Sequence, residues 1–418
     1  MLLNESKRLT SQHYKILGLS WAGWTFDFYD LMLFSFLLIP MRSSLGLTSF
    51  DMSIVVGFTL LSTAIGGIIS GFLADRFGRK TILQLTIIVY SIGAFLCAFS
   101  WSFTSLLIFR IITGLGVGGE WATGQAFIAE TFPPKFRGKY TGIVQSGAAV
   151  GSILAAVVGG FLAPVIGWRL SFLISVLPAL IVIIIRKTLT ESDLWLKNRE
   201  KYRTRSATAE FKKLLNNKHR SKFILALILC IFGMSAYWFT YTWLPEYLNL
   251  TKALPLQNTA ILVITIQIGA FLGYITFGRV SDSIGRRPAF TIYGILMAIG
   301  ILMFTLFWDF TFSYPFLIYL FMFIAGIGTG FFTGFAAVFS EIFPTSIRST
   351  AMGSIFNIAR GIQFVTPVII AYLSEMGSEG YGIAIAAIFA LLTGLWIWTL
   401  PETVSTELGE MDKKDLAN

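Results

Sequence analysis

The sequence has few of the residues on which most soluble and secreted proteins depend. Only 13% of its 418 residues are charged, whereas a soluble chain has about a quarter. Two cysteines and two histidines are too few for a disulfide framework or a metal-ligand set. The polar N-terminus lacks the apolar core and cleavage site of a secretory signal. No nucleophile or nucleotide-binding pattern appears, so we expect neither an enzyme nor a bound cofactor.

Apolar residues are what the sequence has in excess. It is 55% hydrophobic, has a mean hydropathy of +0.73 and contains 39 Phe and 39 Gly. Because an unpaired backbone group in lipid costs several kcal/mol, an apolar run that crosses a bilayer is predicted to be a helix. Twelve such runs can be placed, at 14–40, 51–74, 81–100, 104–131, 139–163, 168–186, 222–247, 256–278, 288–308, 314–341, 350–374 and 381–400.

Four landmarks occur twice, at a nearly constant spacing of about two hundred residues. The pairs are 71–80 with 278–287, the glycine run 113–118 with 325–330, Glu130 and Arg137 with Glu341 and Arg348, and Glu191 with Glu402. They predict two homologous halves, and paired membrane bundles are typical of transporters. The expected segments are a cytoplasmic N-terminus (1–13), an N-terminal six-helix bundle (14–186), a cytoplasmic linker (187–221), a C-terminal six-helix bundle (222–400) and a cytoplasmic tail (401–418).

The distribution of basic residues predicts which side of the membrane each loop faces. The chain has 32 Lys and Arg and a net charge of +10. With both termini cytoplasmic, only Arg42, Arg169 and Lys252 lie in outer loops, and Arg110 and Arg360 lie inside spans. All other basic residues face the cytoplasm, where anionic lipid attracts them. The pattern predicts a multi-pass plasma-membrane protein with no nucleic-acid partner.

Several motifs resemble those of the major facilitator superfamily. The loops 71–80 and 278–287 look like its hallmark motif, and Arg110-x3-Gly114-x-Gly116 looks like its second motif. Asp27-Phe-Tyr-Asp30 and Gly118-Gly-Glu-Trp121 resemble its metabolite:proton symporters, including the sialate and carboxylate types. The resemblance implies an all-α integral membrane fold of twelve transmembrane helices in two pseudo-symmetric six-helix bundles. It also implies alternating access to a site between the bundles.

Four ionisable residues of the first half are predicted to couple transport to protons: Asp27, Asp30, Arg110 and Glu120. Charge at membrane depth is costly, so each of these residues needs a partner or a function. Asp27 and Asp30 share one side of a helix, within possible reach of Arg110. Burial favours a protonated carboxyl group and a guanidinium favours the ionised form, so such a carboxylate can load and release a proton. The alternatives are a static ion pair between spans one and four and, for Glu120, a neutral hydrogen-bonded acid.

Arg360 is the predicted contact for an anionic substrate. Asn357, Arg360 and Gln363 recur every three residues and form one polar stripe on span eleven. A guanidinium matches a carboxylate through two parallel hydrogen bonds. Apart from Glu246 near an end, the spans of the second half offer no carboxylate to neutralise Arg360. The alternative is an ion pair with Asp27 or Asp30 across the bundle interface.

Further polar and aromatic side chains are candidates to complete the substrate site, although each is also a common packing residue. They are Tyr237, Trp238, Tyr241, Gln267, Gln125 and Gln145. A third set of charges is predicted to gate the cytoplasmic side, because the resembling family uses such networks to hold its outward-open state. These charges are Asp75, Arg79, Glu130, Arg137, Asp282, Arg286, Glu341 and Arg348.

Together these features predict a secondary transporter that takes up a small organic anion, a carboxylate, by proton symport. Protons serve as the coupling ion, no metal or organic cofactor is expected, and one chain in the lipid bilayer suffices. The alternative within transport is a sugar or polyol:proton symporter, in which Arg360 pairs internally. A non-transporting sensor on the same scaffold is a weaker alternative, because the tail is short.

Overall fold

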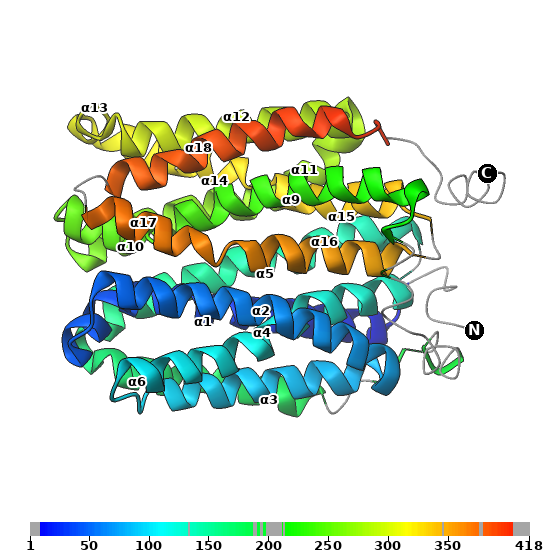
Figure 1. The fold of residues 1–418 in the computed structure, drawn as a ribbon, viewed down its shortest axis with the longest axis horizontal. Helices are drawn as coiled ribbons and strands as arrows, with labels where there is room; N and C mark the ends of the chain where they lie inside the picture. Colours follow the sequence, from blue (N-terminus) through cyan, green and yellow to red (C-terminus); the bar gives the residue numbers. More distant parts are fainter. Residues whose placement is uncertain are drawn as a thin grey trace.

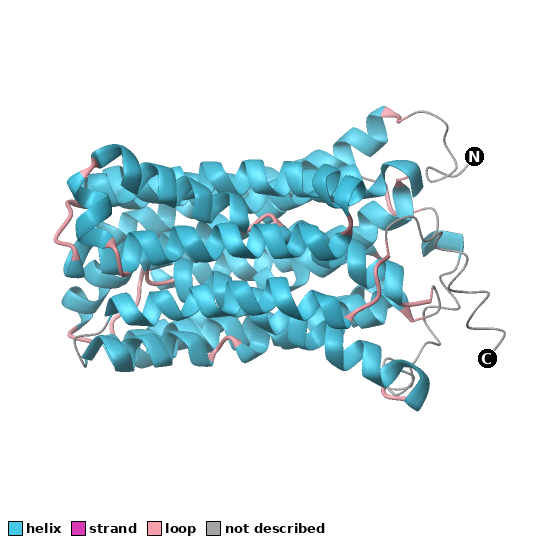
Figure 2. Ribbon diagram, turned by 90° about the horizontal axis from the view of Figure 1, so that it is seen from above, coloured by secondary structure: helices cyan, strands magenta, loops and turns pink. Residues whose placement is uncertain are grey.

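The computed structural model describes residues 9–132, 134–186, 190–192, 195–197, 211, 214–344, 347–375 and 379–403. Within these residues every regular element is a helix, and the long helices run roughly alongside one another (Figures 1 and 2). The blue start and the red end of the described chain lie at the right-hand end of Figure 1. We call this end of the molecule the termini end and the opposite end the far end.

The first half contains six long helices. They are α1 (Ser11–Leu45), α2 (Ser49–Phe77), α3 (Arg79–Cys97), α4 (Phe103–Thr131), α5 (Pro134–Val157) and α6 (Ala163–Arg186). A π-helical turn, Val158–Leu162, joins α5 to α6. Gly167 then breaks the regular geometry of α6 with φ 81° and ψ 161°, a backbone conformation that favours glycine.

The second half is built from more, shorter helices. They are α9 (Asn217–Tyr241), α10 (Leu244–Glu246), α11 (Leu256–Ile284), α12 (Arg286–Thr305), α13 (Trp308–Ser313), α14 (Pro315–Gly328), α15 (Phe331–Ile342), α16 (Arg348–Ile362), α17 (Val365–Glu375) and α18 (Glu379–Trp396). Three predicted spans are thus interrupted, between α9 and α10, α14 and α15, and α16 and α17. Proline accounts for one interruption, because Pro367 has no N–H to bond the carbonyl of Gln363.

Eleven helical runs of the described residues are long and apolar enough to cross a membrane. The run Tyr140–Val176 covers α5 and the start of α6, which the sequence predicts as two spans. In Figure 1 the helices of the first half form the lower group and those of the second half the upper group. The groups meet where α5 packs along α11 and where α2 packs along α16 and α17. Any site shared by the halves therefore lies along these contacts.

Glycine allows two helices of the second half to approach closely. Alanine substitutions at two glycines of α11 should therefore differ in their effect on stability. A Cβ on Gly273 of α11 would lie 2.3 Å from the carbonyl oxygen of Ile327 on α14. A Cβ on Gly278 of the same helix would have no atom within 4 Å. We expect Gly273→Ala to lower the melting temperature in detergent, because overpacking costs about 1–3 kcal/mol.

Gly278→Ala is the matched control for this test. It should leave the melting temperature unchanged or raise it, since alanine stabilises a helix by about 1 kcal/mol relative to glycine. Equal melting temperatures for the two variants would contradict the close approach of α11 and α14.

Candidate functional site

Helices α1 and α4 hold a buried ion pair in the first half. Nη1 of Arg110 donates to Oδ2 of Asp30 at 2.8 Å, and the two side chains are 1% and 3% exposed. The guanidinium also lies over Phe34, with Cζ 4.2 Å from the ring centre. Within the described residues, Oδ1 of Asp30 and Nε of Arg110 have no hydrogen-bond partner. The predicted meeting of spans one and four therefore occurs through Asp30.

A small cavity adjoins this ion pair, with room for about one water molecule. Both halves line it, through Leu31, Phe34, Ser35, Val56, Thr59, Leu60 and Arg110 of the first half and Trp238 and Thr242 of the second. Buried Nε1 of Trp238 and Oγ1 of Thr242 have no hydrogen-bond partner among the described residues. The Asp30–Arg110 pair thus borders the interface between the halves. A change in the charge of the pair can therefore alter contacts in both halves.

Arg360 of α16 is also buried at the interface between the halves. Its Cζ lies 5.5 Å from the ring centre of Trp24 on α1 and 5.1 Å from that of Phe356. Within the described part of the chain, its Nε and Nη1 donate no hydrogen bond. Asp27 of α1 attracts it electrostatically. The guanidinium therefore faces an indole ring and a carboxylate of the other half and a phenyl ring of its own helix, while keeping donors available.

The two amides of the predicted polar stripe are engaged in helix contacts. Nδ2 of Asn357 donates to the carbonyl of Gly353 at 2.9 Å. Its Oδ1 lies so near Gly67 of α2 that a Cβ there would be 2.1 Å away. Gln363 accepts from Ser235 of α9 at 3.1 Å. In this structure both amides connect helices, and their role in substrate binding stays a prediction.

Aromatic residues of α9 lie beside Arg360 at the interface. Tyr237 stacks on Tyr241 with ring centres 4.3 Å apart, and it contacts Phe28 of α1 edge-on at 6.0 Å. The Tyr237 hydroxyl interacts with Ser152 of α5 and Gln267 of α11. The side chain therefore touches both halves at once, as expected of a residue in a site between them.

Several buried polar atoms in this region have no hydrogen-bond partner among the described residues. They include the donors Nε1 of Trp24, Nε1 of Trp238 and Nε2 of Gln267 and the acceptor Oδ1 of Asp30. Such atoms are rare in folded proteins and often mark a place for a ligand or water. Indole and amide N–H groups can only donate, so these three atoms suit acceptor oxygens of a ligand. Nε2 of Gln125 on α4 also has no hydrogen-bond partner among the described residues, and its role as a substrate contact stays a prediction.

Glu120 and Gln145 are two further buried candidates of the first half. Glu120 is buried and accepts from the Thr86 hydroxyl of α3 at 2.6 Å. It lies ten residues from Arg110 along α4, about 15 Å of helix rise, and α3 packs on helices of the first half. Gln145 is buried on α5. Their predicted roles as a second proton site and a substrate contact remain predictions.

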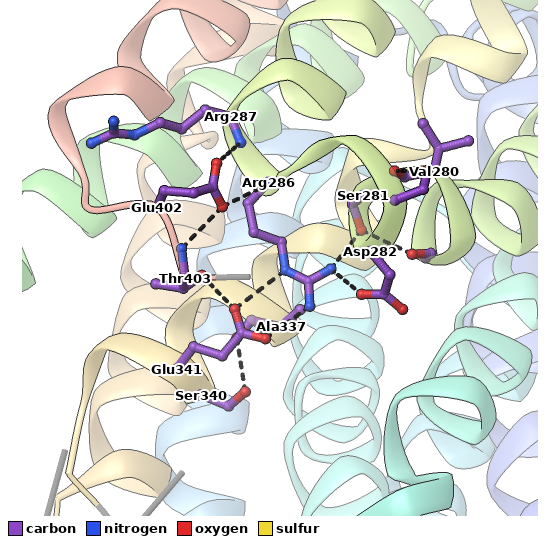
Figure 3. A network of polar contacts seen from close by, with 12 residues as sticks. Val280, Ser281, Asp282, Arg286, Arg287, Ala337, Ser340, Glu341, Glu402 and Thr403 are labelled. Atoms are coloured by element: carbon purple, nitrogen blue, oxygen red, sulfur yellow. Dashed lines mark hydrogen bonds and ion pairs between the residues drawn. The ribbon is translucent and has the colours of Figure 1, made fainter. Parts of the chain in front are cut away.

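Six of the eight predicted gating charges form equivalent networks, three in each half, at the termini end. In the second half, Arg286 pairs with Asp282 at 2.6 Å and with Glu341 at 2.9 Å (Figure 3). Glu402 accepts from the backbone N–H groups of Arg286 and Arg287 at 2.9 and 3.0 Å. The carboxylate thereby caps the start of α12, where the helix dipole favours negative charge.

The first half repeats these contacts. Arg79 pairs with Asp75 at 2.5 Å and with Glu130 at 2.8 Å. Glu191 accepts from the N–H groups of Arg79 and Lys80 at 3.0 and 3.2 Å. The sequence marked Glu191 and Glu402 only as repeated landmarks, and their repetition was the signal for this capping role.

The ion pairs of Arg79 with Asp75 and Glu130, and of Arg286 with Asp282 and Glu341, each lie within one half. Nε of Arg348 donates to the carbonyl of Phe343, also in the second half, at 3.2 Å. The side chain of Arg137 lies outside the described residues. A latch made by these charges in another state of the protein stays a prediction.

An ion pair that does join the halves lies at the far end, and sequence reasoning missed it. Nη1 of Arg42, near the end of α1, donates to Oε1 of Glu246 in α10 at 2.9 Å. It also donates to Ser49 at the start of α2. Glu246 is thus paired with Arg42, not with Arg360. The available signal was a cation and a carboxylate at the same expected end of two spans.

Comparison with known proteins gives consistent matches over the whole chain. The family model described as Major Facilitator Superfamily matches residues 20–276, and the one described as Sugar (and other) transporter matches 205–414. The "Probable 4-methylmuconolactone transporter" of Cupriavidus pinatubonensis is 33% identical over 97% of this chain and 94% of its own length. The "Sialic acid transporter NanX" of Escherichia coli is 29% identical over 94% of each chain.

Solved structures confirm the predicted fold class. The proton:xylose symporter XylE, bound to 6-bromo-6-deoxy-D-glucose, superposes with a TM-score of 0.76 at 22% identity, over 97% of this chain and 99% of that one. At this level of identity, the likeness establishes the arrangement of helices and leaves the ligand open.

Proposed function

Because this chain belongs to the major facilitator superfamily and is a multi-pass membrane transporter rather than an enzyme, we propose that it takes up a small carboxylate by symport with protons. Substrate and proton bind between the two halves and reach each side of the membrane in turn. Protons are the coupling ion, and no other cofactor enters the cycle. One chain forms the whole transport unit.

The observation that carries the proposal is the state of Arg360. It is 2% exposed, it lies between the halves, and its Nε and Nη1 have no hydrogen-bond partner among the described residues. Leaving donors of a buried charged group unpaired costs free energy, which a bound carboxylate recovers through two parallel hydrogen bonds. Nearby indole, amide and hydroxyl donors supply contacts for further acceptor oxygens of the substrate.

Proton coupling is assigned to the carboxylates of α1. Asp30 pairs with Arg110, and its Oδ1 has no hydrogen-bond partner among the described residues, so this oxygen can receive a proton. Protonation removes the charge that Arg110 pairs with, so the guanidinium must find other contacts, and the packing of α1 on α4 changes. Asp27, which attracts Arg360, links the proton sites to the anion site. Symport of one proton with a monoanion is electroneutral and is driven by the pH gradient.

The orientation in the membrane follows from charge. Arg42, Arg169 and Lys252 are the basic residues expected in outer loops, and Arg42 and Lys252 lie at the far end beside α10. The positive-inside rule then assigns the termini end to the cytoplasm and the far end to the outside. The protein would lie in the plasma membrane with both termini cytoplasmic.

A sugar or polyol:proton symporter is the second candidate. It is favoured by the Sugar (and other) transporter model, which matches residues 205–414. In that case Arg360 would act only as the partner of Asp27, and hydroxyl groups would meet the buried donors.

Uptake into proteoliposomes distinguishes the two candidates. With an inward proton gradient and no membrane potential, we expect accumulation of one acid from a panel containing sialic acid, muconate, aromatic acids and lactate. Xylose, glucose and a polyol should not accumulate and should not compete with that acid. Gradient-driven uptake of a neutral sugar, with none of the acids, would replace the carboxylate proposal by the sugar alternative.

A further inference from the structure

Arg42 and Glu246 close the far end of the interface between the halves, and we infer that this ion pair is the outer gate of the transporter. The inference rests on the proposed function for its orientation and names residues to which the transport proposal gives no role. The pair must break before Asp30, Arg110 and Arg360 can be reached from outside.

The ion pair connects the first half of the protein to the second half. Arg42 belongs to α1 of the first half and Glu246 to α10 of the second, and their side chains are 25% and 5% exposed. The second donor contact of Arg42, to Ser49, fixes the guanidinium against the start of α2. The basic side chain is partly exposed while the carboxylate is nearly enclosed, so separating the halves would hydrate Glu246 and offset the lost attraction.

The pair lies at the end of a helix face that leads to the cavity. On α1, residues 30, 34, 38 and 42 are spaced by four and share one face, which runs from Asp30 to Arg42. In the second half, Trp238 of α9 and Thr242, which follows α9, line the cavity beside Arg110 with Phe34, and Glu246 of α10 lies four residues further along the chain. The path from the far end to the proton site therefore leads past Arg42 and Glu246 and then past Thr242.

The pair connects the two halves directly at the far end, where Arg42 of α1 meets Glu246 of α10. Helix α1 also packs against α10 there. The ion pair therefore helps to hold the far end closed in this structure.

Thiol labelling from outside tests the gate. A cysteine at Thr242, which lies between the ion pair and the cavity, is the reporter, and a membrane-impermeant thiol reagent is added to intact cells. The native Cys97 and Cys230 are buried, and the protein without the reporter gives their background. We expect Arg42→Gln and Glu246→Gln each to raise the labelling rate at least about tenfold. The charge exchange Arg42→Glu with Glu246→Arg should return the rate toward that of the parent.

Arg169→Gln is the matched control, because it removes an outer arginine whose contacts are backbone carbonyls of the same half, at Ala98 and Ser100. It should leave the labelling rate unchanged. The gate inference would be wrong if both single variants were labelled at the parental rate. It would also be wrong if the exchange variant were labelled as fast as the single variants. Since labelling needs neither substrate nor a proton gradient, failure of the carboxylate proposal would not alter this result.

Discussion

Replacement of Arg360 by alanine is expected to lower carboxylate uptake at least about a hundredfold, or about 2.7 kcal/mol of lost interaction. The reason is that two charge-assisted hydrogen bonds to the substrate disappear together. Some loss of stability is expected as well, because the buried Asp27 loses the charge that attracts it. Initial rates in proteoliposomes, with melting temperature measured on the same samples, give the comparison.

Arg360→Lys is the informative companion variant. Lysine keeps the charge but loses the planar fork, so it should bind the acid weakly and recover only a small part of uptake. If instead lysine and alanine both transport at the parental rate, Arg360 is the static partner of Asp27. The substrate would then bind elsewhere, and the sugar alternative would gain support.

The sequence predicted the fold well because the relevant signals are local or repeated. A hydrophobic run reports a span wherever it packs, and the doubled loops reported two halves. The networks of Arg79 and Arg286 were also predictable in kind, since Asp75–Arg79 and Asp282–Arg286 are four residues apart on the chain. The two copies of each motif formed the same contacts because they occupy the same place in each half.

Contacts between the halves were harder to predict from sequence. Arg42 and Glu246 are 204 residues apart in the chain, and their meeting depends on how one bundle is placed against the other. The spacing of Asn357 and Gln363 correctly placed both on one side of a helix. It could not show that Asn357 lies against Gly67 of α2 or that Gln363 accepts a hydrogen bond from Ser235 of α9. Hydropathy also gave no sign of the helix interruptions, because an apolar turn scores the same as an apolar helix.

Asp30→Asn is expected to abolish proton-driven accumulation of the acid, again by about a hundredfold or more, while substrate exchange across the membrane continues. Asparagine cannot take up and release a proton, so a pH gradient no longer drives the cycle, but the halves can still move with substrate bound. Uptake under a proton gradient and exchange at equal pH, measured on the same proteoliposomes, separate these two activities. Asp27→Asn is the companion variant three residues away on α1, and it should alter substrate affinity through Arg360. Loss of proton-driven uptake in this variant as well would place coupling on both carboxylates.

Stability distinguishes a coupling role of Asp30 from a structural one. Asp30→Asn leaves the buried Arg110 without its counter-charge, and breaking a buried pair from one side costs about 3–5 kcal/mol. The double variant Asp30→Asn with Arg110→Gln removes both charges, so it should recover much of the melting temperature. If the pair were only a static tie between α1 and α4, proton-driven uptake would recover together with stability. We expect the double variant to be stable and still uncoupled, because the residue that carries the proton is absent from it.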